Sequence, residues 1–326
     1  MRTAWLKIRM GLCVVLLFAV IYALLIVIAT FTGAGTPIIY ALIAFVLVGI
    51  QFFIGPKIVE RSMRVRYVSE QEQPELHRMV SELAMKAGIP KPRVGISEIS
   101  IPNAFAFGTS KKKARVCVTR RLMEMLSRDE LEAVLGHELS HIKHQDMVVI
   151  TALSVIPMIC YFIYFSFFWS GIFGGGMGRS REGALPTMAI ALIAFVVYFI
   201  SNLIVLYASR IREYYADAGS AELTRKPQAL ASALYKMIYG SAGAKREKVK
   251  KEMESMRAFF AADPVTARRD LKDLRAADLN KDGKIDEYEL RTFAESAKAT
   301  RADRIMEIFS THPTPVSRVK KLGEYL

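Results

Sequence analysis

The segment GHELSH, at residues 136–141, places two histidines and a glutamate at a spacing that suits metal chemistry. Residues i and i+4 of a helix lie on one face, so His137 and His141 can both point a ring nitrogen at one ion. Glu138 lies on the neighbouring surface, where it can take a proton from a metal-bound water. Such an H-E-x-x-H pattern is typical of zinc-assisted hydrolysis. The alternative is a helix with coincidental surface histidines, and His144, off the shared face, is expected to be solvated.

A third metal ligand is required, because a catalytic zinc usually takes three protein ligands and one water. The chain has only five histidines, so a carboxylate is a reasonable third ligand. In SRIREYYADAGSAEL (209–223), Glu213 and Asp217 share a helix face, and one can bind metal while the other steadies a histidine ring. Alone, this pair is an ordinary helix face. The pair becomes a stronger candidate because both the pair and His141 lie at ends of apolar runs, which can bring them close together.

Four apolar stretches are long enough to span a bilayer, which takes about 20 helical residues. No charge occurs between Arg9 and Lys57, and TGAGTP (32–37) divides that stretch into two helices. The third run covers 147 to about 173, and the fourth covers about 185 to 208. We therefore predict a mainly α, polytopic membrane protein with four transmembrane helices and a cytoplasmic α+β domain with a small β-sheet.

The basic residues predict the orientation of these spans. They gather before the first span, after the second and after the fourth, while the first turn carries none. Basic residues favour the cytoplasmic side, so we expect a multi-pass cell-membrane protein with its catalytic domain and both termini in the cytoplasm. The net charge of +14 is then explained by topology, with the lipid bilayer and not nucleic acid as the partner. Three cysteines do not make a disulfide framework.

The predicted organisation alternates membrane and cytoplasmic segments. Strand-like runs RVGISEI and ARVCVTRRL surround NAFAFG, and Ser127 with Glu130 forms a capping box for the helix that carries the histidines. The segments are a transmembrane hairpin at 1–56, a catalytic segment at 57–146, two spans at 147–208 and a cytoplasmic helical segment at 209–326.

Four motifs in order, GHELSH, SRIREYYADAGSAEL, NAFAFG and STHPTPVSRVKKL, resemble the HtpX-type membrane zinc metalloproteases, which are related to the CAAX prenyl endopeptidases. The resemblance covers nearly the whole chain. It implies one zinc ion held by His137, His141 and Glu213, with Glu138 as general base and Asp217 behind the site. It also implies polypeptide substrates, above all misfolded or damaged membrane proteins cut at the cytoplasmic face in quality control, and self-cleavage is compatible with it.

Two further segments take roles from this resemblance. Asn103, Ala104 and Phe105 begin an edge segment on which an extended substrate can add as a strand; the alternative is a plain hairpin edge. His312, in STHPTP, is implied to face the cleft as a catalytic residue that stabilises the oxyanion or orients the Glu213 helix. A structural cap is the alternative, and Arg318 is a weaker candidate for the same role.

The segment DLNKDGKIDEYE (278–289) departs from that family pattern and matches a twelve-residue EF-hand loop. Gly283 occupies the turn position and Ile285 the apolar one. EF-hands usually act in pairs and no second loop is present, so we expect a weak calcium site that stiffens its surroundings and tunes proteolysis; the alternative is a decayed loop. Its candidate ligands are Asp278, Asn280, Asp282, Lys284 (carbonyl), Asp286 and Glu289.

The sequence therefore predicts a membrane-bound zinc endopeptidase. One rival is an intramembrane protease of the site-2 type, which has its H-E-x-x-H motif inside the membrane. Here the charged residues at 128–132, just before the motif, place the helix of the motif in water. The other rival is a non-catalytic, metal- or calcium-responsive membrane scaffold. The intact Glu138 argues against a scaffold, because a structural metal site has no use for a general base.

Overall fold

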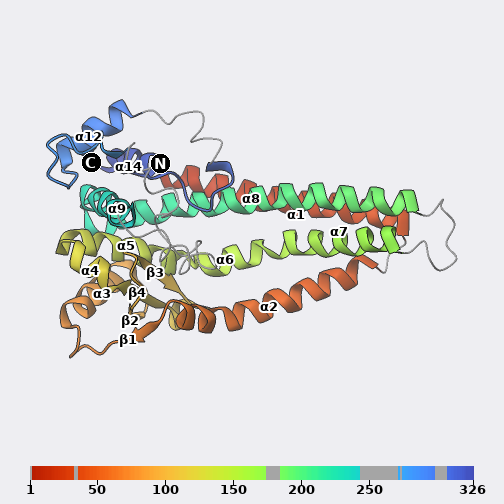
Figure 1. Cartoon of the computed structure of the whole chain (residues 1–326), viewed down its shortest axis with the longest axis horizontal. Helices are drawn as coiled ribbons and strands as arrows, with labels where there is room; N and C mark the ends of the chain where they lie inside the picture. The colour runs from red at the N-terminus through yellow and green to blue at the C-terminus, as the bar shows by residue number, and fades with distance from the viewer. Residues whose placement is uncertain (1, 33–35, 174–183, 243–270, 272–273, 298–306) are drawn as a thin grey trace. The chain divides into compact units, whose positions relative to one another are not determined.

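The computed structural model describes residues 2–326 except for 33–35, 174–183, 243–270, 272–273 and 298–306 (Figure 1). The chain divides into two compact units. The first combines Met1–Gly55 with Val148–Ile211, and the second combines Pro56–Met147 with Arg212–Leu326. The described residues are mostly helical with one small mixed sheet, which confirms that part of the predicted fold class.

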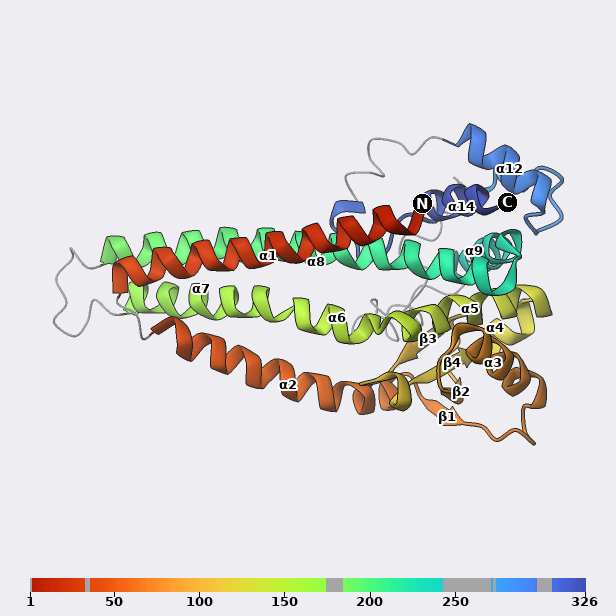
Figure 2. The ribbon, with the colours of Figure 1, turned by 180° about the vertical axis from the view of Figure 1, so that it is seen from behind.

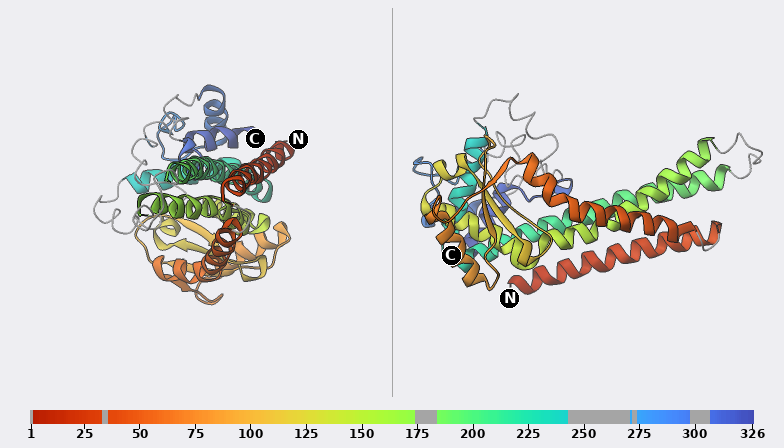
Figure 3. Two further views of the ribbon diagram at one scale, coloured as in Figure 1. Left: turned by 90° about the vertical axis from the view of Figure 1, so that its right-hand side faces the viewer. Right: turned by 90° about the horizontal axis from the view of Figure 1, so that it is seen from below.

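The first unit is built from long helices (Figures 2 and 3). Tyr161 and Tyr164 of α7 contact Tyr198 and Phe195 of α8, with ring centroids 5.7 and 5.2 Å apart. This aromatic seam holds α7 and α8 side by side. The helices that contribute to the unit are α1 (Arg2–Thr32), α2 (Thr36–Ser62), α6 (Asp146–Leu153), α7 (Val155–Phe173) and α8 (Ala184–Thr224).

The surface of this unit carries large apolar side chains that a water-soluble protein would bury. Phe53, Leu192 and Phe165 are 71%, 64% and 44% exposed, respectively. Among the described residues, Asp146–Ile172 and Thr187–Thr224 are long and apolar enough to cross a membrane, and Ile8–Leu24 is a shorter apolar helix. Of the four expected spans, the third and the fourth are thus long and apolar enough in the described residues. The presence of four spans stays a prediction.

The second unit contains a four-stranded sheet in the order β1-β2-β4-β3. β2 and β4 are parallel, while β1–β2 and β3–β4 are antiparallel. The strand expected over ARVCVTRRL ends early, because Thr119 caps a short helix, α4, by accepting the Leu122 N–H. The strands are β1 (Val65–Tyr67), β2 (Arg93–Ser97), β3 (Ala104–Phe107) and β4 (Arg115–Thr119).

Helices stack on this sheet in layers. α5 packs against β3, α3 and α9, and α14 packs against α9 and α12, as Figures 1 and 2 both show. The buried aliphatic side chains of these elements form one continuous core. The helices are α3 (Pro74–Ala87), α4 (Arg120–Met125), α5 (Arg128–His144), α9 (Pro227–Ala242), α12 (Glu287–Ser296) and α14 (Pro315–Leu322).

Helix α5, which carries the metal motif, is fixed at its N-terminus. The predicted capping box is present: Ser127 accepts from the Glu130 N–H, and the Glu130 carboxylate accepts from the Ser127 N–H. The same carboxylate accepts hydrogen bonds from Ser232 and Lys236 of α9 at 2.6 and 2.8 Å. One buried carboxylate therefore holds both the start of α5 and its neighbour α9.

Small residues let the C-terminal part of α8 approach α5 closely. A Cβ added to Gly219 would lie 2.8 Å from the Ser140 Cβ, and one added to Gly136 would lie 3.2 Å from the Ser220 hydroxyl oxygen. Ser220 donates to the carbonyl of Ala133 at 2.6 Å. This crossing sets the distance between the two histidines of α5 and the two carboxylates of α8.

Candidate metal centre

Three side chains converge at the α5–α8 crossing. The ligand atoms of His137, His141 and Glu213 all lie within 4.8 Å of one another. The two Nε2 atoms are 3.1 Å apart, and the Glu213 oxygens lie 3.7 Å from the His137 Nε2 and 3.5 Å from the His141 Nε2. Tetrahedral zinc with bonds of about 2.0–2.1 Å separates its ligands by about 3.3 Å. The three distances therefore have the size that one tetrahedral ion requires.

The partners of the other ring nitrogens indicate the tautomers. The Nδ1 of His137 lies 2.9 Å from Asp217, and the Nδ1 of His141 lies 2.6 Å from Asp146. Each Nδ1 donates its hydrogen to the carboxylate, so in the neutral rings both Nε2 atoms carry lone pairs. Two lone pairs facing each other repel unless a cation lies between them. The arrangement is that of a metal site with a carboxylate behind each histidine.

Asp146 contacts a candidate ligand, and the sequence reasoning missed it. Helix α5 ends because Gln145 adopts a left-handed conformation with φ 56°, and α6 starts at the next residue. This sharp turn folds Asp146 back onto His141. Arg212 of α8 donates to the other oxygen of Asp146. The sequence signal that could have indicated this role is the acidic residue directly after the motif helix, in the segment HQD (144–146).

Arg318 forms the floor of the site. It is 1% exposed and binds Asp217 through two hydrogen bonds, Nη2 to Oδ1 at 2.6 Å and Nε to Oδ2 at 3.0 Å. Burial lowers the pKa of Arg318, but the carboxylates of Asp217 and Glu213 outweigh burial and hold it above its ordinary value. The sequence indicated Arg318 only weakly. The structure places it beside a candidate ligand, because its Nη2 lies 3.4 Å from the His137 Nδ1.

One oxygen of Glu213 has the surroundings expected of a metal ligand. Glu213 is 6% exposed, and its Oε2 accepts no hydrogen bond within normal geometry. His312 and Arg318 approach that oxygen at 3.3 and 3.4 Å as ion pairs. A buried carboxylate oxygen that accepts no hydrogen bond of normal geometry, beside two ring nitrogens with lone pairs, fits a divalent cation. The predicted ligand set thus comes together, and His312 lies next to it.

Glu138 is buried, with 5% exposure, on the same helix turn as His137. Its carboxylate contributes to raising the pKa of Arg318 and that of Cys117 of β4. Burial, followed by the charges of Glu60 and Glu138, raises the pKa of the Cys117 thiol to about 12. Cys117 is therefore a packing residue and not a competing nucleophile.

The three residues suggested for substrate binding lie in and beside the edge strand β3. Asn103 is fully buried; its N–H donates to the Thr119 hydroxyl oxygen, and its carbonyl accepts from the Thr119 N–H, each at 2.9 Å. Ala104 and Phe105 are 2% and 3% exposed. β3 pairs with β4 on one side only, and α5 packs against it. Any recognition of a substrate by this segment would therefore use the main chain of β3.

The remaining predicted positions lie apart from the three ligands. His144 is exposed; its Nδ1 lies 2.9 Å from the Ser140 carbonyl, and its ring centroid lies 5.7 Å from that of Tyr215. The predicted calcium ligands, at 278, 280, 282, 284, 286 and 289, form a loop that ends at the start of α12.

The site has the arrangement of a metal centre in which a glutamate from a second helix joins the two histidines of an H-E-x-x-H helix. Comparison with known proteins identifies the family. The profile of peptidase family M48 matches residues 70–326, and the chain belongs to that family.

The relatives that it resembles include HtpX proteases. The chain is 54% identical to "Protease HtpX homolog" of Methanothermobacter thermautotrophicus over 233 residues, or 72% of this chain and 86% of that protein. It is 38% identical over 278 residues to the homolog of Moorella thermoacetica, covering 85% and 80%. The crystal structure of S. mikatae Ste24p shares the fold, with a TM-score of 0.53 at 17% identity, covering 98% of this chain and 67% of that one. The resemblance seen in the sequence is thus confirmed.

Proposed function

We propose that the protein is a membrane-bound, zinc-dependent endopeptidase that hydrolyses misfolded or damaged membrane proteins at the cytoplasmic face. The observation that carries this proposal is the convergence of the two histidine Nε2 atoms and the Glu213 carboxylate at 3.1–3.7 Å. Membership of a peptidase family and the similarity to HtpX proteases support the reaction class.

His137, His141 and Glu213 are the proposed zinc ligands. The bound ion would lower the pKa of a water molecule toward about 7 and polarise the scissile carbonyl. Glu138, buried beside His137, takes the proton of the attacking water and delivers it to the leaving amine. Asp217 and Asp146 hold the two rings in the tautomer that presents Nε2.

Two basic side chains, His312 and Arg318, complete the proposed chemistry. His312 lies 3.3 Å from Glu213 and is 23% exposed at its side chain, so it can reach a substrate that enters from solvent. We assign it the stabilisation of the negative charge that develops on the carbonyl oxygen. The fully buried Arg318 holds Asp217 and is a positioning residue.

The substrate is expected to bind as an extended strand. β3 has an unpaired edge in the described sheet, and its main chain can fix a peptide by β-addition. Such binding uses hydrogen bonds to the main chain of the substrate and does not depend on its side chains. This suits a protease that acts on unfolded segments of many proteins. We place four spans in the bilayer, because the sequence has four apolar runs of spanning length. Two of them, Asp146–Ile172 and Thr187–Thr224, adjoin the motif helix α5 and contain the Glu213 segment, respectively.

The direct test is proteolysis of an unfolded protein by the zinc-loaded chain in detergent, compared with Glu138→Gln. We expect wild type to cut, a chelator to stop cleavage, added zinc to restore it, and the variant to be inactive with its zinc retained. Glu124→Gln is the matched control, because Glu124 is an exposed carboxylate of α4 outside the site. Equal activity of Glu138→Gln and wild type would overturn the proposed base. If neither cleaves although both hold zinc, the scaffold function takes precedence.

A further inference from the structure

The loop of residues 278–289 is a second, separate cluster of oxygen donors. Its backbone has the turn that a twelve-residue cation loop needs, with Gly283 at φ 80° in the sixth position. Ile285, in the eighth position, is 2% exposed and anchors the loop in the core. Asp286 caps α12 by accepting the Glu289 N–H at 2.8 Å. The loop is therefore fixed at its middle and at its end.

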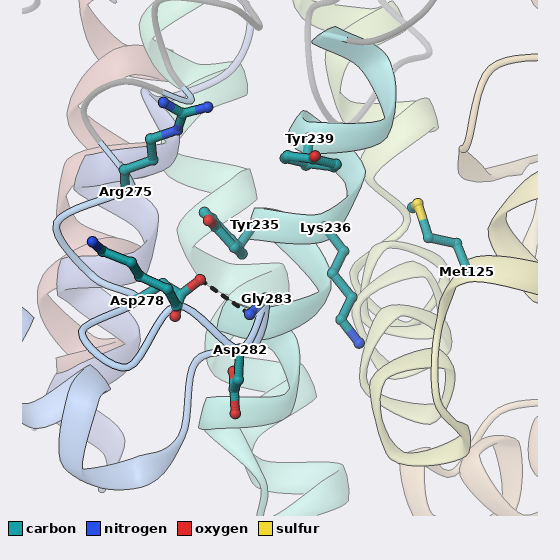
Figure 4. Close-up of a pocket in the computed structure, with 9 residues that line it drawn as sticks. Met125, Tyr235, Lys236, Tyr239, Arg275, Asp278, Asp282 and Gly283 are labelled. Carbon is teal, nitrogen blue, oxygen red and sulfur yellow. Dashed lines mark hydrogen bonds between the residues drawn. The ribbon is translucent and has the colours of Figure 1, made fainter.

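Asp278 provides the independent indication of a ligand. It is 6% exposed, its Oδ2 accepts from the Gly283 N–H at 3.1 Å, and its Oδ1 is buried without a hydrogen bond of normal geometry (Figure 4). Tyr235 of α9 is its neighbour, and burial together with the Asp278 carboxylate raises the pKa of that phenol. The Tyr235 phenol interacts with this carboxylate, but a buried oxygen that no hydrogen bond of normal geometry satisfies is costly unless an ion binds it.

Glu289, at the twelfth position, is the second buried carboxylate of the loop, with 3% exposure. Its Oε1 accepts from the N–H groups of Leu279 and Asn280 at 2.8 and 3.1 Å, so it already reaches back across the loop. Each carboxylate oxygen has two lone pairs and can bind a cation while it keeps such hydrogen bonds. Asp282 and Asn280 add exposed oxygens on the near side.

Beside Asp278 lies a cavity of about 720 Å³, lined also by Tyr235, Lys236, Tyr239 and Arg275 (Figure 4). The ammonium of Lys236 is bound to Glu130 of α5 at 2.7 Å and is thus already neutralised. The cavity is large enough for a hydrated ion to approach the loop.

We propose that this loop binds one calcium ion, a hard cation that takes six to eight oxygen ligands. The site is distinct from the zinc centre and does not depend on the proposed peptidase activity. The ligands are the carboxylates of Asp278, Asp282 and Glu289, the amide oxygen of Asn280, the carbonyl of Lys284 and, through a water, Asp286.

The consequence of binding follows from the elements that the loop joins. α12 begins at Glu287 and packs against α14, with Leu290 and Phe293 of α12 and Leu322 of α14 buried in one core. α14 carries Arg318, the floor of the metal centre. A calcium ion therefore stabilises the layer that holds Arg318 in place.

The test measures calcium binding itself, by equilibrium dialysis of radioactive calcium against the full-length, zinc-loaded Glu138→Gln protein in detergent. We expect one weakly bound calcium per chain with a Kd of about 10⁻⁴ M, at the weak end of the range of such sites, and a midpoint of thermal unfolding that rises with calcium. The double variant Asp278→Asn and Glu289→Gln keeps one acceptor oxygen at each position and should lose that site. Glu287→Gln removes an exposed charge from the same loop and should bind like the parent.

Asp282→Ala guards against misfolding of the double variant, because Asp282 is exposed. We expect it to bind calcium at least tenfold more weakly, with the unfolding midpoint in calcium-free buffer unchanged. The proposal is overturned if the parent binds no calcium at 5 mM, about fifty times the expected Kd. It is also overturned if both ligand variants bind calcium as tightly as Glu287→Gln.

Discussion

The contact between Gly219 and Ser140 determines whether the zinc ligands can meet, and Gly219→Ala tests it. The new Cβ would lie 2.8 Å from the Ser140 Cβ. Carbon atoms pack at about 3.5–4.0 Å, so α5 and α8 must move apart locally by about 1 Å. Glu213 lies on the same helix, less than two turns away, while His137 and His141 lie on the other. Metal sites tolerate errors of about 0.2 Å, so this separation should weaken zinc binding at least tenfold.

The stability of the variant reflects two opposing terms. Overpacking costs about 1–3 kcal/mol, while replacing a helical glycine by alanine gains about 1 kcal/mol. The net loss of stability is therefore small, and zinc affinity should change far more than the unfolding midpoint. Zinc affinity is measured by competition with a chelating dye in the Glu138→Gln background, where self-cleavage is absent. Gly49→Ala is the control, because nothing lies within 4 Å of a Cβ at that helical position.

A second substitution tests the proposed cause. Ser140→Gly removes both side-chain atoms that the new methyl group meets, so the double variant Ser140→Gly and Gly219→Ala should regain most of the zinc affinity. Unchanged zinc affinity in Gly219→Ala would refute the reasoning that this crossing sets the metal geometry. A loss that Ser140→Gly fails to reverse would show that the steric argument is wrong.

Three further predictions concern the groups around the centre. Asp146→Asn removes the carboxylate that orients a histidine ligand, so zinc affinity should fall about 10- to 100-fold in the dye competition; equal affinity would contradict its role. Arg318→Met leaves the buried Asp217 carboxylate without its cationic partner and with only His137 as a donor, and should cost about 3–5 kcal/mol in denaturant unfolding. A loss under about 1 kcal/mol would show that the contact with His137 is enough to stabilise Asp217. Burial raises the pKa of Glu130, but hydrogen bonds, first from Lys236, outweigh it and lower the pKa below its ordinary 4.5. Glu130 thus stabilises the fold fully above about pH 4.5 and progressively less as the pH falls through its lowered pKa, so the midpoint difference from Glu130→Gln should shrink in acid.

Local rules made much of the centre predictable from the sequence. The i, i+4 spacing placed His137 and His141 on one face, and the capping box at Ser127 fixed the start of their helix. The pair on the second helix was also visible, but its spacing alone did not decide which acid would bind metal. In the structure Glu213 faces both Nε2 atoms, and Asp217 faces the far nitrogen of His137.

The remaining features depend on tertiary contacts that no local pattern encodes. Arg318 reaches Asp217 across 101 positions of sequence, and its burial follows from the packing of α14 on α9. Asp146 meets His141 only because Gln145 takes a left-handed conformation, which is uncommon for a residue other than glycine. Similarly, the glycine at 219 has an ordinary helical context, and its role appears only when α5 lies against it.

The central claim is that two histidines and one glutamate hold a single zinc ion, and X-ray absorption at the zinc edge tests it most directly. The sample is the full-length Glu138→Gln protein in detergent, with zinc and protein quantified together. We predict one zinc per chain with nitrogen and oxygen neighbours at about 2.0–2.1 Å, the multiple scattering of two imidazoles, and its loss in Glu213→Ala. Sulfur at about 2.3 Å, or an unchanged zinc environment in Glu213→Ala, would contradict the account.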